Sequence, residues 1–227
     1  MSGDSAKSKL FQFYPSPFCA KVRKILEYKG VPHETIEVDY LDRGELLAAS
    51  GQIMVPVWRE DGEATFDSNR IAERLECLYP EPTIFPPGIA GLHRALTEYF
   101  DNQVEDAVFR VAVLDELEYF KARGPQHLAF FRLIRDRKYG EGFCDRMARE
   151  ENQNWERVRK ILAPLDQALA DKAFVLGRIG LADFALYGQL WFLAFTGKLK
   201  IPAEFANLRA FFARVDRITA SLEGVNI

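Results

Sequence analysis

The sequence of 227 residues contains only three cysteines and three histidines. The cysteines, Cys19, Cys77 and Cys144, are too few and too scattered for a disulfide framework. Their scarcity favours a reducing compartment, and we expect the cytoplasm. The histidines lie far apart and give no two-histidine metal spacing on one helix, so we expect no metal site.

Several sequence signals of other protein classes are missing as well. There is no apolar run of about 18 residues, so we expect no membrane span. The polar segment Met1–Ser8 lacks the apolar stretch of a secretory signal and is expected to be a loose tail. No glycine-rich phosphate loop follows a strand, which argues against a dinucleotide or nucleoside triphosphate enzyme. No Gly-x-Ser-x-Gly nucleophile elbow occurs either. A formal net charge of −3 gives no general attraction to nucleic acid or to an anionic membrane.

What is present is a change of pattern at a proline-rich stretch, residues 80–88. Before it, short apolar and alternating runs predict a mixed sheet with helices packed on it, an α/β domain over residues 9–82. The segment between the second strand and the hairpin is poorly defined. The expected elements are a strand at 10–13, a helix at 17–30, a strand at 33–39, a hairpin at 57–66 and a helix at 71–79.

After the proline-rich stretch the apolar residues recur almost everywhere with helical period. This predicts an all-α helical-bundle domain over residues 90–220. We expect breaks at Gly124-Pro125 and around residues 140–142, where glycine and proline interrupt the pattern. The expected helices are 92–120, about 145–170, 181–195 and 205–215.

The most distinctive chemistry lies at Ser16-Pro17-Phe18-Cys19, between the first strand and the first helix. A helix N-terminus offers unpaired amide donors and the positive end of the helix dipole, so it stabilises an anion such as a thiolate. Taken alone, the segment is more typical of a serine N-cap followed by proline at the first helical position.

Two further segments have a similar double interpretation. Val55-Pro56 precedes a strand, where a cis proline would expose the backbone of Val55 to a peptide-like ligand. Asp67-Ser68 begins a helix and either caps it or binds a ligand. In the second case Asp67 meets an ammonium group, and Ser68 with nearby amides binds a carboxylate.

In this order the three segments resemble the thioredoxin-like domain of the glutathione transferases, from about Lys9 to Pro80. Residues 176–184, Leu-Gly-Arg-Ile-Gly-Leu-Ala-Asp-Phe, resemble the signature of that family's helical domain. There Asp183 reaches back to the helix start, and Ile179 packs on Phe184. Gly180 stands where Ser or Thr is usual, at an expected cost of roughly a few tenths of a kcal/mol.

The resemblance implies a role for each matching residue. It makes Ser16 the catalytic residue, whose hydroxyl bonds the glutathione sulfur. It implies that Val55 pairs its backbone with the cysteinyl part, with Pro56 cis. Asp67 and Ser68 match the pair that holds the γ-glutamyl end, where Glu or Gln is commoner than Asp.

At the glycine end of glutathione the sequence departs from the family pattern. Met54 stands where Lys or Gln often meets the glycine carboxylate, and Gln52 is a candidate substitute. The resemblance also implies a homodimer. The electrophile pocket would be apolar and lie between the domains, with candidates along residues 102–110.

We therefore predict a glutathione transferase that activates glutathione, its co-substrate, as a thiolate for addition to a small apolar electrophile. One alternative is a non-catalytic glutathione-binding or protein-interaction module. The other is a thiol–disulfide oxidoreductase using Cys19, although Ser16 replaces the first cysteine of a Cys-x-x-Cys motif and Cys19 is expected to be buried. Tyr14 is a second candidate for the sulfur contact.

Overall fold

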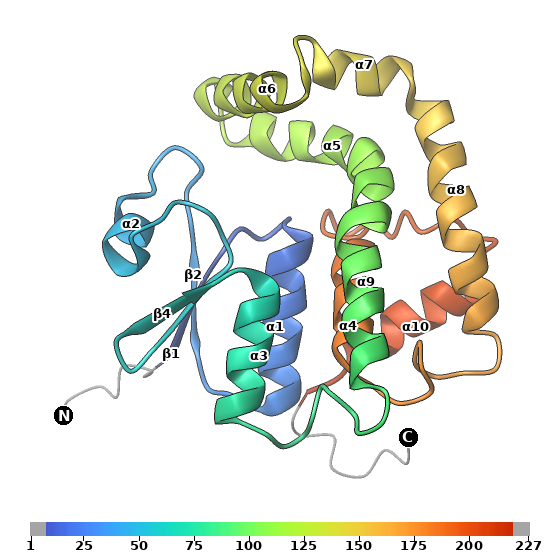
Figure 1. Ribbon diagram of the computed structural model, residues 1–227. Coiled ribbons are helices and arrows are strands. Elements are labelled where there is room, and N and C mark those ends of the chain that lie inside the picture. The colour runs from blue at the N-terminus through green and yellow to red at the C-terminus, as the bar shows by residue number, and fades with distance from the viewer. Residues whose placement is uncertain (1–7, 220–227) are drawn as a thin grey trace.

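The computed structural model describes residues 8–219, and its first part is a four-stranded mixed sheet with helices (Figure 1). The strand order is β2-β1-β3-β4; β1 is parallel to β2 and antiparallel to β3, and β3 and β4 form a hairpin. This confirms the predicted α/β, thioredoxin-like arrangement. The elements are β1 (Ser8–Gln12), α1 (Pro17–Lys29), β2 (Glu34–Glu37), α2 (Gly44–Ser50), β3 (Val57–Glu60), β4 (Glu63–Phe66) and α3 (Ser68–Leu78).

The ends of α1 follow from its sequence. Ser16 has extended backbone angles and its Oγ accepts a hydrogen bond from the Cys19 amide at 3.3 Å, so it is the N-cap. Pro17 occupies the first helical position, where no amide hydrogen is needed. Gly30 has a φ of 64° and ends the helix in the left-handed conformation.

Two details of this half differ from the predictions. The poorly defined segment contains α2, a seven-residue helix in which only Leu46 is buried, so it has no apolar stripe to detect. The predicted tail extended to Ser8, but Ser8 is buried in β1 and its hydroxyl accepts a hydrogen bond from the Trp58 indole. Residues 1–7 of that tail lie outside the described residues.

The second part is helical, which confirms the predicted all-α half, although residue 220 of the expected domain is outside the described residues. Where one helix was expected at 92–120, a π-helical turn separates α4 from α5. The helix expected near 145–170 is two helices that meet at Glu150. The elements are α4 (Ala90–Tyr99), the π-helical turn η1 (Phe100–Val104), α5 (Glu105–Ala122), α6 (Pro125–Tyr139), α7 (Phe143–Arg149), α8 (Glu151–Ala168), α9 (Leu181–Trp191) and α10 (Ala206–Asp216).

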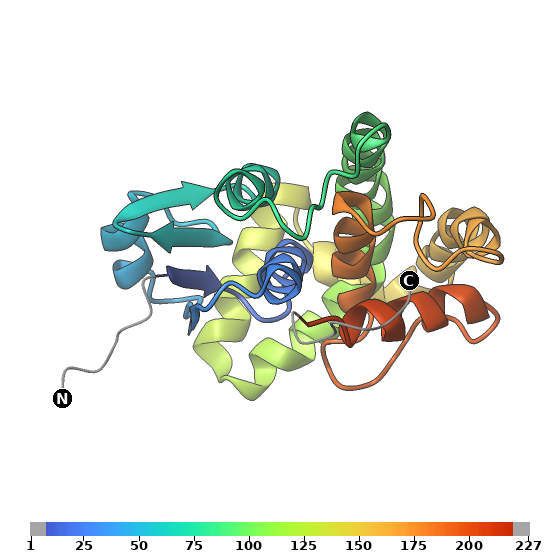
Figure 2. The same cartoon turned by 90° about the horizontal axis from the view of Figure 1, so that it is seen from below.

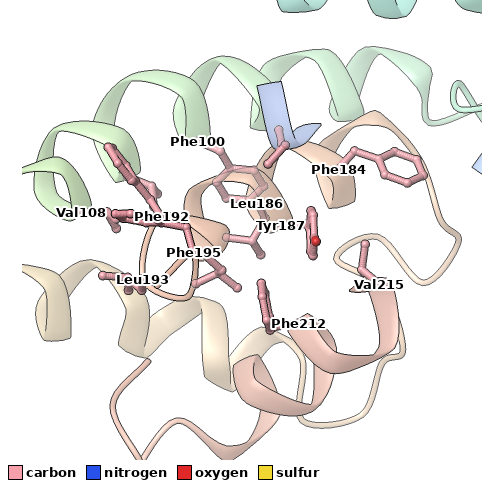
Figure 3. Packing of buried hydrophobic residues seen from close by; sticks show 14 of the residues in the cluster. Phe100, Val108, Phe184, Leu186, Tyr187, Phe192, Leu193, Phe195, Phe212 and Val215 are labelled. Atoms are coloured by element: carbon pink, nitrogen blue, oxygen red, sulfur yellow. The ribbon is translucent and has the colours of Figure 1, made fainter. Parts of the chain in front are cut away.

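The two halves share one hydrophobic core. Helix α1 lies between the sheet and α9, and α9 is almost entirely buried (Figures 1 and 2). Within the helical half, aromatic and aliphatic side chains of η1, α9 and α10 pack together, including Phe100, Tyr187 and Phe212 (Figure 3). No helix within residues 8–219 combines the length and apolar character that a membrane crossing requires.

The start of α9 has the expected carboxylate cap. Asp183 is buried, and its two oxygens accept hydrogen bonds from the amides of Gly180 at 2.9 Å and Val175 at 2.8 Å. His93 of α4 adds a contact that the sequence did not suggest: its Nδ1 accepts a hydrogen bond from the Ala182 amide at 3.3 Å. A Cβ at position 180 would lie 2.5 Å from the His93 ring. The histidine therefore occupies the space of the hydroxyl residue that Gly180 replaces.

Candidate functional site

A cavity of about 510 Å³ lies between the loop before β3, the N-terminus of α3 and the junction of α4 with η1. It brings together five of the six predicted site residues: Gln52, Val55, Pro56, Asp67 and Ser68. Ser16 does not line the cavity, but Phe18, on the first turn of the same helix, does. The remaining lining residues are Met54, Phe66, Asn69, Glu98, Asp101 and Asn102.

The backbone of Val55 is open to a ligand. The Val55-Pro56 peptide bond is cis, and the ladder of β3 begins only at Val57. Within residues 8–219 neither the amide nor the carbonyl of Val55 makes a hydrogen bond. Since backbone polar groups are normally paired, this edge can accept an extended peptide.

Asp67 caps α3 and lines the cavity at the same time. Its Oδ1 accepts hydrogen bonds from the amides of Asn69 at 2.9 Å and Arg70 at 3.1 Å, so the capping interpretation is confirmed. Its φ of 72° is rare for a residue other than glycine, and such conformations concentrate at ligand sites. The adjacent Ser68 hydroxyl has no hydrogen-bond partner among the described side chains and is available to a ligand.

Ser16 and Cys19 have different environments although they are one turn apart. The Ser16 side chain is half-buried, and its hydroxyl oxygen accepts a hydrogen bond from the Cys19 amide at 3.3 Å. Cys19 is fully buried and its sulfur accepts a hydrogen bond from the Phe13 amide at 3.4 Å. Burial raises the pKa of the Cys19 thiol to about 11, so the thiol stays protonated at neutral pH.

Tyr14 is held against the helical half. Its carbonyl accepts a hydrogen bond from the Trp191 indole at 3.0 Å, and the two rings meet edge to face at 5.2 Å. The Arg23 guanidinium lies over both rings. Tyr14 does not line the 510 Å³ cavity.

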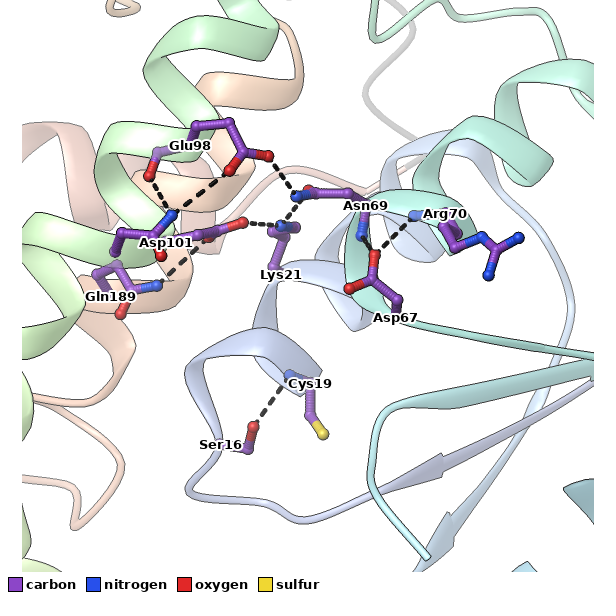
Figure 4. A network of polar contacts seen from close by, with 10 residues as sticks. Ser16, Cys19, Lys21, Asp67, Asn69, Arg70, Glu98, Asp101 and Gln189 are labelled. Atoms are coloured by element: carbon purple, nitrogen blue, oxygen red, sulfur yellow. Dashed lines mark hydrogen bonds and ion pairs between the residues drawn. The ribbon is translucent and has the colours of Figure 1, made fainter. Parts of the chain in front are cut away.

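Next to the cavity, a hydrogen-bonded network around a buried ion pair joins α1, α3, η1 and α9 (Figure 4). Lys21 of α1 is 1 % exposed, and its Nζ lies 2.6 Å from Asp101 Oδ2 and 2.6 Å from Asn69 Oδ1. Gln189 of α9 donates to Asp101 at 3.5 Å. Desolvation lowers the pKa of the Lys21 ammonium, while Asp101 opposes that shift. The network fixes Asn69, next to Ser68, relative to the helical half.

The helical half contributes residues that the sequence did not identify. Of the predicted stretch 102–110 only Asn102 lines the cavity; residues 107–109 are in the core, and Arg110 pairs with Asp106. Glu98 and Asp101 line it instead. A signal existed in Lys21, a cation on the buried face of α1 that needs a carboxylate, but many acidic residues were available as its partner.

A second cavity, of about 230 Å³, lies between the loop after β2 and the end of α5. Four of its eight lining residues are aromatic and three are charged. His127 of α6 contacts Asp39 at 3.1 Å beside it, which ties this loop to the helical half. The lining residues are Phe13, Glu37, Val38, Asp39, Tyr40, Tyr119, Phe120 and Arg123. Among residues 8–219 no group of three or more His, Cys, Asp or Glu side chains is placed to hold a metal ion.

Comparison with known proteins agrees with this geometry. The family model "Glutathione S-transferase, N-terminal domain" matches residues 10–83, and "Glutathione S-transferase, C-terminal domain" matches residues 147–214. A probable glutathione S-transferase of Nicotiana tabacum is 31% identical over 183 residues, which cover 79% of this chain and 68% of the relative.

Solved structures share the fold. A glutathione S-transferase of Ceriporiopsis subvermispora in complex with glutathione has a TM-score of 0.77 at 21% identity, covering 93% of this chain and 97% of that one. The beta-etherase LigF of Sphingobium has a TM-score of 0.68 at 20% identity, covering 93% and 95%. With both family domains in order and a relative matched over most of its length, the chain belongs to the glutathione S-transferase family.

Proposed function

We propose that this protein is a glutathione transferase that holds glutathione in the 510 Å³ cavity as a thiolate and adds it to a small apolar electrophile. The observation that carries the proposal is the meeting of the unpaired Val55 backbone, the α3 N-terminus at Asp67-Ser68 and the first turn of α1 around one cavity. These are three peptide-binding features in one place.

The γ-glutamyl end has both signs of charge, and the α3 end of the cavity offers a partner for each. The Ser68 hydroxyl and the positive end of the α3 dipole suit its carboxylate. Asp67, Glu98 and Asp101 supply carboxylates for its ammonium group. The cysteinyl residue then pairs with the backbone of Val55, as a short added strand.

In this orientation the sulfur points toward the start of α1. The Ser16 hydroxyl donates a hydrogen bond to the thiolate, and the helix dipole adds to the stabilisation of the thiolate. A hydrogen bond to a charged group contributes about 1.5–3 kcal/mol, which corresponds to lowering the thiol pKa by about one to two units. The thiolate attacks the electrophilic carbon and forms the sulfur–carbon bond, while the leaving group takes the electron pair of the bond that breaks.

The second cavity is our proposal for the electrophile site. Phe13, which lines it, directly precedes the loop that carries Ser16. Tyr40, Tyr119 and Phe120 in its lining favour an aromatic group in the partner, beside the charged Glu37, Asp39 and Arg123. We further propose that the protein is a homodimer and lies in the cytoplasm. Sedimentation as a monomer at micromolar concentration would contradict the dimer.

The test removes the Ser16 hydroxyl in two ways. In Ser16→Ala the bound thiol should titrate about one to two units higher, and kcat/KM at pH 7 should fall roughly 10- to 100-fold. Ser16→Gly retains most of the N-cap stability and should lose the same activity. If Ser16→Ala conjugates electrophiles as fast as the wild type at neutral pH, the role of Ser16 is wrong.

One observation favours a second candidate, a module that binds glutathione without turnover: Ser16 is not among the residues that line the cavity. Calorimetric binding of glutathione, together with no turnover across an electrophile panel, would support the module. The burial and raised pKa of Cys19 argue against thiol–disulfide exchange through that residue.

A further inference from the structure

The charge of the main cavity is one-sided. Three of its twelve described lining residues are carboxylates, Asp67, Glu98 and Asp101, and none of the twelve is Lys or Arg. Lys21 neutralises Asp101 from behind, but its ammonium group is buried between Asp101 and Asn69 and is not available to an anion. Glutathione itself has two carboxylates and one ammonium group.

The end of the cavity away from α3 has no cationic side chain among its described lining residues. The side-chain amide of Gln52 donates to the Met54 carbonyl at 2.6 Å and accepts from the Met54 amide at 2.7 Å, so the loop itself takes one of its two N–H groups and its oxygen. The Met54 side chain is apolar and 66 % exposed. The nearby Arg43 guanidinium donates to the Ile53 carbonyl and lies 4.9 Å from the centre of the Tyr40 ring.

The orientation proposed above, on which this inference rests, places the glycine residue at this end. With the γ-glutamyl group at Asp67-Ser68 and the cysteinyl backbone at Val55, the peptide continues toward Met54 and Gln52. A free carboxylate there would lose water beside an apolar side chain without gaining a cation from the described residues that line the cavity, in the field of the like charges of Asp67 and Glu98.

We propose that the preferred thiol of this protein is glutathione whose glycine carboxyl is blocked, as an amide or ester that is neutral or bears an amine. A blocked glycine removes the unpaired charge and places an uncharged group against Met54. An amine on the substituent would add attraction to the cavity carboxylates. Both changes act on the glycine end and leave the γ-glutamyl and cysteinyl contacts as they are.

The test compares calorimetric dissociation constants of glutathione, glutathione amide and the glycine monoethyl ester. We expect the amide and ester to bind about five-fold tighter than glutathione or more, with the difference shrinking at high salt. Met54→Lys, an exposed substitution, should reverse the order by tightening glutathione alone. Met54→Leu is the matched uncharged control and should keep the wild-type ratio.

Different binding results would contradict the inference and the proposed function. If glutathione binds wild type tighter than the ester or as tightly, or if Met54→Lys does not change the ratio, the inference is wrong while the proposed function stands. If none of the three thiols binds at millimolar concentration, the proposed function fails, and this inference fails with it.

Discussion

The contact between the His93 ring and Gly180 can be tested by substituting both residues, because the ring occupies the space that a side chain at position 180 would need. The backbone of Gly180 has a φ of −170°, which any residue can adopt, so only the His93 ring keeps a side chain out. That ring also accepts the hydrogen bond from the Ala182 amide that an N-cap hydroxyl would otherwise accept. Gly180→Ser should therefore harm a wild-type protein and help one that lacks the imidazole.

The magnitude follows from the contacts. A serine Cβ would lie 2.5 Å from His93 Cε1 and 2.6 Å from Nε2, so the ring must move. Overpacking of this kind costs about 1–3 kcal/mol, and the lost amide bond adds about 1 kcal/mol. His93→Ala alone loses the same bond and leaves a cavity, at about 2–4 kcal/mol. In the double variant the serine hydroxyl restores the cap, so its loss should be smaller than the sum by about 2 kcal/mol or more.

Urea unfolding followed by tryptophan fluorescence measures the four corners of this cycle, since Trp191 is on α9 itself. Gly91→Ser is the matched control: Gly91 lies on α4, where an added Cβ would meet no atom within 4 Å, and its change should stay within about 0.5 kcal/mol. If the two substitutions at 180 and 93 are additive within about 0.5 kcal/mol, His93 does not replace the missing cap.

Other predictions concern the buried Lys21–Asp101 ion pair, the reactivity of the cysteines and the pH dependence of stability. Asp101→Ala should cost about 3–5 kcal/mol in urea unfolding because Lys21 is left without its partner, and adding Lys21→Met should recover much of that loss. Iodoacetamide at pH 7 should modify the exposed Cys77 first, whereas Cys19, with a pKa raised to about 11, should react only after unfolding; mass spectrometry shows the order. Burial lowers the pKa of His93 to about 4, so the folded protein binds fewer protons than the unfolded chain between about pH 4 and 6.5. Stability should therefore fall by about 3 kcal/mol as pH drops through that window, and His93→Gln should lack this part of the slope.

Most of the fold could be predicted because its elements end at residues with strong local preferences. Ser16, Pro17 and Gly30 delimit α1 by capping chemistry, and Asp61-Gly62 forms the hairpin turn between β3 and β4. The errors fall where local signals are weak. Helix α2 is too short to show an apolar stripe, and the π-helical turn η1 lies in an unbroken helical pattern that continues on both sides.

The site divides in the same way. Val55-Pro56 and Asp67-Ser68 were candidates because each is a short local motif that, in this order along the chain, resembles the family pattern. Glu98 and Asp101 were missed because their position depends on how the helical half packs against the sheet, and one acidic residue looks like another in a helical sequence. The same limit applies to His93, whose role depends on a contact 89 residues away in sequence.

The position of the cavity depends on the contact between α1 and α9. A Cβ at Gly188 of α9 would lie 2.4 Å from the Pro17 carbonyl oxygen and 3.3 Å from the Lys21 Cβ, so the two helices approach closely only because a glycine stands there. Pro17 immediately follows Ser16, and Lys21 holds Asn69 beside Ser68 through the buried network. One helix interface thus fixes both the start of α1 and the α3 end of the cavity. An isolated N-terminal half would expose the buried face of α1 and lose Asp101, so we expect the proposed glutathione binding to require both halves together.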